Sequence, residues 1–254
     1  MRRNSRNTSW QKVAPWYNKI TRGGEGHYYH EHVVIPGVLR LLGPVSNILD
    51  LACGNGVLAK SLPKNVKYTG VDLSESLIKY AKSEDKNYNH KYFVGDVADH
   101  LNLAETFDAA AIVLALQNIT DPKAAFENAS RYLIPNSRFV IVLNHPAFRI
   151  PRQSAWGIDE ERKIQYRRVD KYMSPMEIPI RMNPSDPQSQ QTMSYHFPIS
   201  DYSKMLKEAG FVIELIEEWT SDKESVGRAG RMENRSRVEI PLFMCILARK
   251  ISLK

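Results

Sequence analysis

Two aspartates beside strand-like runs have the type and spacing to hold a nucleoside. Asp50 stands just before a glycine turn, and Asp72 follows 22 positions later, at the end of the next apolar run. A carboxylate at Asp50 would repel a pyrophosphate but could accept hydrogen bonds from an ammonium group. A carboxylate at Asp72 could accept hydrogen bonds from a ribose diol, in a nicotinamide dinucleotide or in another nucleoside.

The turn between these aspartates is rich in glycine, with Gly54, Asn55 and Gly56 at its centre. Glycine has no Cβ, so the backbone can bend sharply there and approach a ligand closely. The first turn of a following helix would present unpaired N–H groups to the same space. The string also fits the dinucleotide pattern G-x-G-x-x-G/A, so the turn alone leaves the two kinds of ligand open.

Around this turn, apolar runs alternate with helix-like segments, which predicts an α/β fold with a parallel sheet. The predicted strands cover residues 47–52, 66–72, 91–95, 107–116, 138–143, 211–219 and 240–248. The predicted helices cover residues 10–20, 27–42, 55–62, 74–83, 121–133 and 200–209. Residues 1–9 read as a disordered basic tail and residues 220–237 as a polar loop.

Four motifs in this order resemble those of the class I S-adenosylmethionine (SAM)-dependent methyltransferases of the small-molecule, UbiE-like type. They are the string LDLACGNG at residues 49–56, Asp72, GDV at residues 95–97, and the loop at residues 114–122. The resemblance implies a doubly wound, seven-stranded, mostly parallel sheet with the last strand antiparallel and helices on both faces. It also implies SAM as cofactor, S-adenosylhomocysteine as product, and a lid inserted after strand five.

The resemblance assigns the cofactor site to residues near the ends of the first four strands. In such enzymes the acidic residue at the position of Asp96 contacts the adenine amino group. An N-terminal segment that often contributes a tyrosine, here Tyr17, folds over the cofactor. The predicted cofactor-binding residues are Tyr17, Asp50, Ala52, Gly54, Asn55, Gly56, Asp72, Leu73, Asp96, Val97, Leu114 and Gln117.

His145 follows the fifth predicted strand, where the active edge of the sheet should lie, and is the predicted catalytic residue. Histidine titrates near neutral pH, so it could accept a proton, although a histidine that merely closes the strand is an equal alternative. Arginines that follow it could grip a carboxylate or phosphate. The predicted substrate-binding residues are Tyr29, His30, Phe148, Arg149, Arg152, Trp156 and His196.

The chain of 254 residues divides into an N-terminal helical cap, residues 1–44, and a SAM-binding domain, residues 45–250. Within the domain, residues 145–198 are the expected lid and substrate region. The absence of a long apolar run predicts no membrane span, and the basic start has no apolar segment of a secretory signal. The two cysteines suggest no disulfide framework and indicate a reducing cytoplasm. His27, His30 and His32 lack companion ligands, so no metal is expected.

Three functions remain open from the sequence. The leading one is methylation of a small acceptor, anionic or aromatic in character. The net charge of +7 could instead attract RNA, which makes a tRNA or rRNA methyltransferase the alternative. A non-catalytic SAM-binding protein is the third hypothesis. The sequence does not fix the oligomeric state or the acceptor atom.

Overall fold

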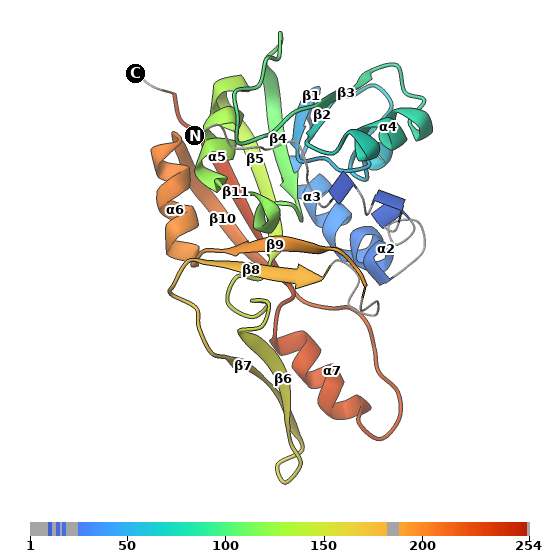
Figure 1. The fold of residues 1–254 in the computed structure, drawn as a ribbon, viewed down its shortest axis with the longest axis vertical. Helices are drawn as coiled ribbons and strands as arrows, with labels where there is room; N and C mark the ends of the chain where they lie inside the picture. The colour runs from blue at the N-terminus through green and yellow to red at the C-terminus, as the bar shows by residue number, and fades with distance from the viewer. Residues whose placement is uncertain (1–9, 12–13, 16, 19–24, 182–187, 253–254) are drawn as a thin grey trace.

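The computed structural model describes residues 10–11, 14–15, 17–18, 25–181 and 188–252 and has a seven-stranded central sheet (Figure 1). The strand order is β10-β11-β5-β4-β1-β2-β3. The strands are β1 (Asn47–Leu51), β2 (Lys67–Asp72), β3 (His90–Val94), β4 (Phe107–Val113), β5 (Leu133–Asn144), β10 (Phe211–Trp219) and β11 (Phe243–Lys250). β1 to β5 pair in parallel, whereas β11 is antiparallel to both β5 and β10. The predicted doubly wound sheet with an antiparallel last strand is confirmed.

Helices cover both faces of the sheet, because its central strands are apolar on both sides. The helices are α2 (Glu25–Tyr29), the π-helical turn η1 (His30–Val34), α3 (Ile35–Leu42), α4 (Glu75–Glu84), α5 (Pro122–Tyr132), α6 (Ile199–Glu208) and α7 (Gly230–Glu239), with the 3₁₀ turns η2 (Ala59–Ser61) and η3 (Leu116–Asn118). α5 and α6 share one buried cluster with the sheet, and α3 and α4 share the other.

The prediction of an α-helix over residues 55–62 is wrong. Residues 54–58 are turns, followed by the single 3₁₀ turn η2. Gly54 and Gly56 both have positive φ, and Pro63 follows directly, so too few residues remain for an α-helix. The strand predicted to Leu116 ends at Val113, because Leu114 has φ 53° and turns the chain into η3.

Two segments in which the sequence predicts no helix or strand contain regular structure. Residues 145–198 hold two antiparallel hairpins, β6 (Ser154–Asp159) with β7 (Ile164–Val169), and β8 (Met176–Arg181) with β9 (Gln191–His196). The polar loop predicted at residues 220–237 is wrong in its second half, which forms α7. Ser236 on α7 donates a hydrogen bond to Gln165 on β7, so the helix and the first hairpin form one lower lobe (Figure 1).

The N-terminal prediction is tested only in part. The tail at residues 1–9 lies outside the described residues, while the described residues between 10 and 18 are helical.

α3 packs so closely on the sheet that a Cβ at Gly37 would lie 2.5 Å from the Trp219 ring. Gly43, with φ 64°, ends α3 as predicted.

Candidate cofactor and active site

The turn after β1 reverses the chain through three residues in the left-handed region. Ala52, Gly54 and Gly56 have φ of 59°, 56° and 75°. The Cys53 N–H donates to the Val71 carbonyl at 3.0 Å, which holds the turn against β2. Only glycine adopts such φ values without strain, so Ala52 is a strained residue beside the site.

Asp72 is fixed by two backbone donors at the end of β2. One carboxylate oxygen accepts from the Gly54 N–H and the other from the Ser74 N–H, both at 2.8 Å. Ser74 in turn caps α4 by accepting from the Leu77 N–H. Burial raises the pKa of Asp72, and the two backbone bonds oppose that shift. The sequence therefore locks this carboxylate beside the glycine turn.

Asp50 is buried and only half satisfied. Its Oδ2 accepts a hydrogen bond from the Tyr68 hydroxyl at 2.7 Å, whereas its Oδ1 has no partner among the described residues. Burial raises the pKa of Asp50 to about 7; the Tyr68 bond lowers it and the nearby Asp72 charge raises it further. An unpaired buried carboxylate oxygen is costly, and a cationic donor would remove that cost.

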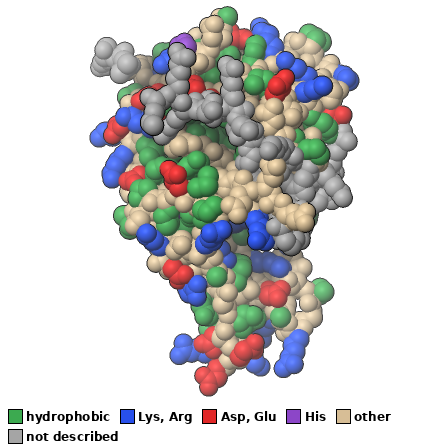
Figure 2. Space-filling model, viewed as in Figure 1, with side chains coloured by type: hydrophobic (Ala, Val, Ile, Leu, Met, Phe, Trp, Pro, Cys, Tyr) green, Lys and Arg blue, Asp and Glu red, His purple; other side chains and the backbone are tan. Residues whose placement is uncertain are grey.

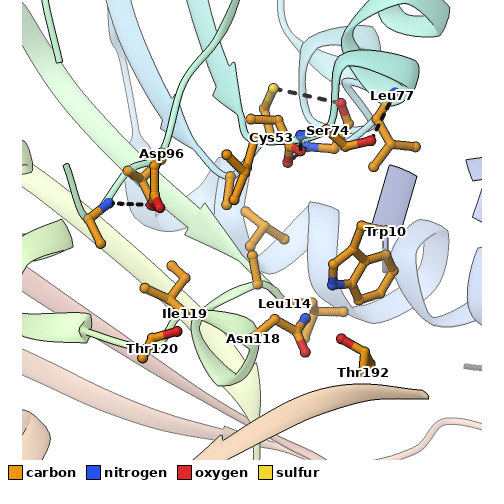
Figure 3. Close-up of a pocket in the computed structure, with 18 of the residues that line it drawn as sticks. Trp10, Cys53, Ser74, Leu77, Asp96, Leu114, Asn118, Ile119, Thr120 and Thr192 are labelled. Carbon is orange, nitrogen blue, oxygen red and sulfur yellow. Dashed lines mark hydrogen bonds between the residues drawn. The ribbon is translucent and has the colours of Figure 1, made fainter. Parts of the chain in front are cut away.

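These groups face a cavity of about 1130 Å³ at the carboxyl ends of β1, β2 and β4 (Figure 3). In an open α/β sheet this is the edge at which ligands bind. The cavity is large enough for a nucleoside cofactor together with a small acceptor. Its lining includes the predicted residues Tyr17, His30, Asp50, Ala52, Gly54, Asp72, Leu73, Asp96, Val97 and Leu114.

Tyr17 lies over the glycine turn, since a Cβ at Gly54 would stand 3.5 Å from its ring. Burial raises the pKa of the Tyr17 hydroxyl, and the charges of Asp72 and Asp50 raise it further. The phenol is therefore a neutral donor near both carboxylates. Trp10 packs edge-on against Tyr17, with ring centroids 5.5 Å apart, and also faces the cavity (Figure 3).

Part of the lining was missed by sequence reasoning. The hairpin β8–β9 closes the cavity opposite the sheet and contributes Glu177, Gln191, Thr192, Met193 and Tyr195. Figure 3 shows Thr192 on β9 facing Leu114 and Asn118. The only signal was the length of the insertion, because these side chains form no recognisable motif. Trp10, in the helix predicted over residues 10–20, also lines the cavity and is not among the predicted site residues.

Three predicted cofactor residues do not line the cavity. The Asn55 side chain donates to Asn18 at 2.9 Å, and Gly56 packs against the Tyr92 hydroxyl. The Gln117 amide donates to the Leu114 carbonyl at 2.7 Å. These residues shape the turn and the loop after β4 from behind, and their contact with a cofactor stays a prediction.

His145 is buried away from the cavity lining. Its Nε2 lies 2.6 Å from Glu218 Oε1, and its Nδ1 accepts from the backbone N–H groups of Ala147 and Phe148. Because Nδ1 is an acceptor, Nε2 carries the proton. Burial lowers the pKa of His145, opposed by Glu218. This is the strand-closing alternative, and the geometry does not favour a catalytic role.

The predicted substrate residues divide in the same way, since only His30 lines the cavity. The His196 Nε2 donates to the Tyr172 carbonyl at 2.6 Å, and Tyr29 bonds Ser221 at 3.0 Å. The others lie around hairpin β6–β7, in the lower lobe or where it joins the sheet: Phe148, Arg149, Arg152 and Trp156. The structure therefore separates them from the cofactor cavity.

Within the described part of the chain, no group of three or more His, Cys, Asp or Glu side chains is placed to hold a metal ion. Cys53 and Cys245 are both buried and free. No helix among the described residues is long and apolar enough to cross a membrane.

The donor set fits SAM better than a dinucleotide. The unpaired oxygen of Asp50 matches the ammonium of an amino acid and would repel a pyrophosphate at the same place. Asp72 stands beside the glycine turn for a ribose, and Asp96 lies across the cavity from Trp10 (Figure 3). Sheet order, turn and carboxylates together define the class I methyltransferase fold.

Comparison with known proteins agrees with that class. Residues 49–141 match the family described as a methyltransferase domain. A SAM-dependent methyltransferase structure from Mesorhizobium loti has a TM-score of 0.66 at 23% identity and covers 85% of this chain and 95% of that chain. The glycopeptide N-methyltransferase MtfA, crystallised with SAM, has a TM-score of 0.58 at 17% identity, over 86% and 92% of the two chains. The chain thus has the fold of the SAM-dependent methyltransferases, and its residues 49–141 match a methyltransferase domain.

Among curated relatives, the ubiquinone biosynthesis O-methyltransferase of Coxiella burnetii is 33% identical over 95 residues, which are 36% of this chain and 41% of that protein. The demethylmenaquinone methyltransferase of Symbiobacterium thermophilum is 25% identical over 215 residues, or 80% and 83% of the two chains. The chain spans less than half the length of the first of these relatives.

Proposed function

We propose that this protein transfers the methyl group of SAM to a small acceptor bound between the cofactor and hairpin β8–β9. The observation that carries the proposal is the unpaired Asp50 oxygen in a cavity that Asp72 also faces. Asp50 would hold the ammonium group, Asp72 the ribose hydroxyls and Asp96 the adenine amino group. A cytoplasmic location also remains part of this proposal.

When bound, the cofactor supplies an electrophilic methyl group on a sulfonium, which passes to an acceptor lone pair and leaves the neutral thioether. The chain then has to align the acceptor with that carbon and exclude water. Leu114, Met193 and Tyr195 supply apolar and aromatic lining for such an acceptor. His30 and Glu177 also line the cavity and have side chains that can accept a proton from a hydroxyl acceptor.

An aromatic acceptor is the favoured class. Trp10 and Tyr195 add aromatic rings to the apolar lining of the cavity. The curated relatives include an O-methyltransferase of ubiquinone biosynthesis, a demethylmenaquinone methyltransferase and a 2-phytyl-1,4-naphtoquinone methyltransferase. We expect the aromatic acceptor to stack against the rings of Trp10 and Tyr195.

Labelled SAM incubated with the protein and a small-molecule extract tests this proposal. We expect label in a low-molecular-weight aromatic product, and loss of that label in the Asp50→Asn variant. Label in RNA, abolished by ribonuclease and by high salt, would favour the RNA alternative. SAM binding without turnover in any extract would favour the non-catalytic alternative.

A further inference from the structure

No described residue accepts a hydrogen bond from the guanidinium group of Arg149. Arg149 lies in the turn after β5, where its backbone N–H donates to the His145 carbonyl at 2.8 Å. Its guanidinium carbon lies 5.3 Å from the centroid of the Phe243 ring. Among the described residues, no hydrogen bond or ion pair is formed by this side chain. Its five N–H donors are therefore available to a ligand.

Arg167 on β7 brings a second positive charge to the same turn. Its Nε donates to the Phe148 carbonyl at 2.6 Å, and its Nη2 donates to Ser154 Oγ at 2.8 Å. Its guanidinium also stacks over the Trp156 ring at 5.2 Å. All of these partners are neutral, so they fix the guanidinium without compensating its charge.

The two charges affect each other. Burial lowers the pKa of Arg149, and repulsion from Arg167 lowers it further. Burial also lowers the pKa of Arg167. Yet solvent still reaches the Arg149 side chain, which is exposed. The Arg149 side chain therefore lies against the Phe243 ring and is open to water, so a ligand can reach it.

Several other arginines of this protein are neutralised by a carboxylate. Arg40 binds Glu217, Arg168 binds Asp170 and Arg249 binds Glu214. Arg149 and Arg167 lack such a carboxylate among the described residues, although Asp170 lies three residues beyond Arg167. The two positive charges repel each other, and an anion bound between them would relieve that repulsion.

The surroundings extend the positive region. Tyr29 packs against Phe243, with centroids 5.8 Å apart, and Lys223 lies over the Tyr29 ring with Nζ 4.9 Å from its centroid. On the face shown in Figure 2, lysine and arginine side chains gather across the narrow part of the molecule, where the lower lobe joins the sheet. An approaching anion would be attracted over this whole region.

We propose that Arg149 and Arg167 form an oxyanion site, separate from the cofactor cavity, that binds the phosphate, sulfonate or carboxylate group of a small ligand. Guanidinium groups bind such oxygens through paired N–H donors. The aromatic rings of Phe243 and Trp156 would hold the two guanidiniums in place while the anion bridges them. The site does not depend on methyl transfer and stands without it.

Calorimetric titration with inorganic phosphate, phenyl phosphate and benzoate at constant ionic strength tests the site. We expect saturable binding of the phosphate probes at one site in the wild-type protein, and at least about tenfold weaker binding in Arg149→Met. Arg149→Lys should fall between the two, because it keeps the charge and loses the paired donors. Arg162→Met is the matched control, because Arg162 lies at the tip of hairpin β6–β7, which carries Arg167, and pairs with Asp159.

S-adenosylhomocysteine binding, measured in parallel, reports on the cofactor site and on folding of each variant. Wild-type protein that binds none of the three anions overturns the oxyanion site even if the cofactor binds. Equal loss in the Arg149 and Arg162 variants would also overturn it, since the effect would then be general electrostatics. If a short RNA bound through Arg149 and the small probes did not bind, the site would be one for nucleic acid, and the proposal of a small ligand would be overturned.

Discussion

The buried carboxyl of Asp50 predicts how SAM binding depends on pH. Burial raises its pKa to about 7, with the Tyr68 bond opposing and the Asp72 charge adding to the shift. Only the ionised form can pair with the cofactor ammonium, which stays protonated below its own pKa of about 8. Between pH 5.5 and 7.0 the ionised fraction rises from about 3% to about 50%, so affinity should rise roughly fifteenfold.

Isothermal titration at a series of pH values measures this dependence. The control ligand is 5′-methylthioadenosine, which keeps the adenine and ribose and lacks the amino-acid end. Its affinity should stay within about twofold over the same range, because in the proposed binding mode it would contact Asp72 and Asp96 but has no ammonium for Asp50. The Asp50→Asn variant should bind SAM weakly and lose the pH dependence.

Two results would refute the assignment of Asp50. One is an equal pH dependence for SAM and methylthioadenosine, which would place the titrating group at the nucleoside end. The other is an Asp50→Asn variant that keeps the wild-type slope.

Without ligand, the Asp50→Asn variant should be more stable than the wild type. A raised folded pKa means that the neutral carboxyl favours the folded state, so this stabilisation is present below pH 3.8 and is lost as pH rises through about 7. At pH 8 the uncharged Asp50→Asn side chain avoids that loss. We expect its urea midpoint to exceed that of the wild type, and a lower midpoint would contradict this account of burial.

Three further predictions concern the turn and the strand end, each measured by urea unfolding. Ala52→Gly should raise the free energy of unfolding by about 1 kcal/mol, because it relieves a φ of 59°; a decrease would show that no strain is stored there. Gly56→Ala should lower the free energy of unfolding by about 2 kcal/mol, because the new Cβ would lie 2.7 Å from the Tyr92 hydroxyl. An unchanged free energy would mean that the Tyr92 ring moves aside. Burial lowers the pKa of His145 below 6.5, so the neutral ring stabilises the fold fully above pH 6.5 and less as the pH falls. His145→Gln should therefore weaken the dependence of the free energy of unfolding on pH. An identical pH profile in the variant would exclude His145 as the source of that dependence.

The core of the fold could be predicted because its signals are local. The apolar runs of β1 and β4 are buried on both faces, and such strands read as continuous apolar stretches. The carboxylates Asp50 and Asp72 stand beside strands, so topology alone brings them together. The glycine turn was also correctly placed, although its two positive-φ glycines prevent the helix that the sequence pattern indicated after it.

The rest of the site depends on contacts between distant segments. Hairpin β8–β9 carries Pro179 and partly exposed polar residues, so its alternation gives no clear strand signal. α7 has a mostly polar sequence and is held through Ser236 to Gln165 rather than by an apolar face. His145 could not be assigned from sequence, because its partner Glu218 lies 73 residues away.

Hairpin β8–β9 covers the cavity without joining the central sheet, since it forms a two-stranded sheet of its own among the described strands. Lifting it away would break side-chain contacts but no strand-to-strand backbone ladder with β1 to β5. In the proposed function, the spent thioether cofactor could therefore depart by displacement of this hairpin, while the backbone bonds to Asp72 and the Tyr68 bond to Asp50 keep both carboxylates in place between turnovers.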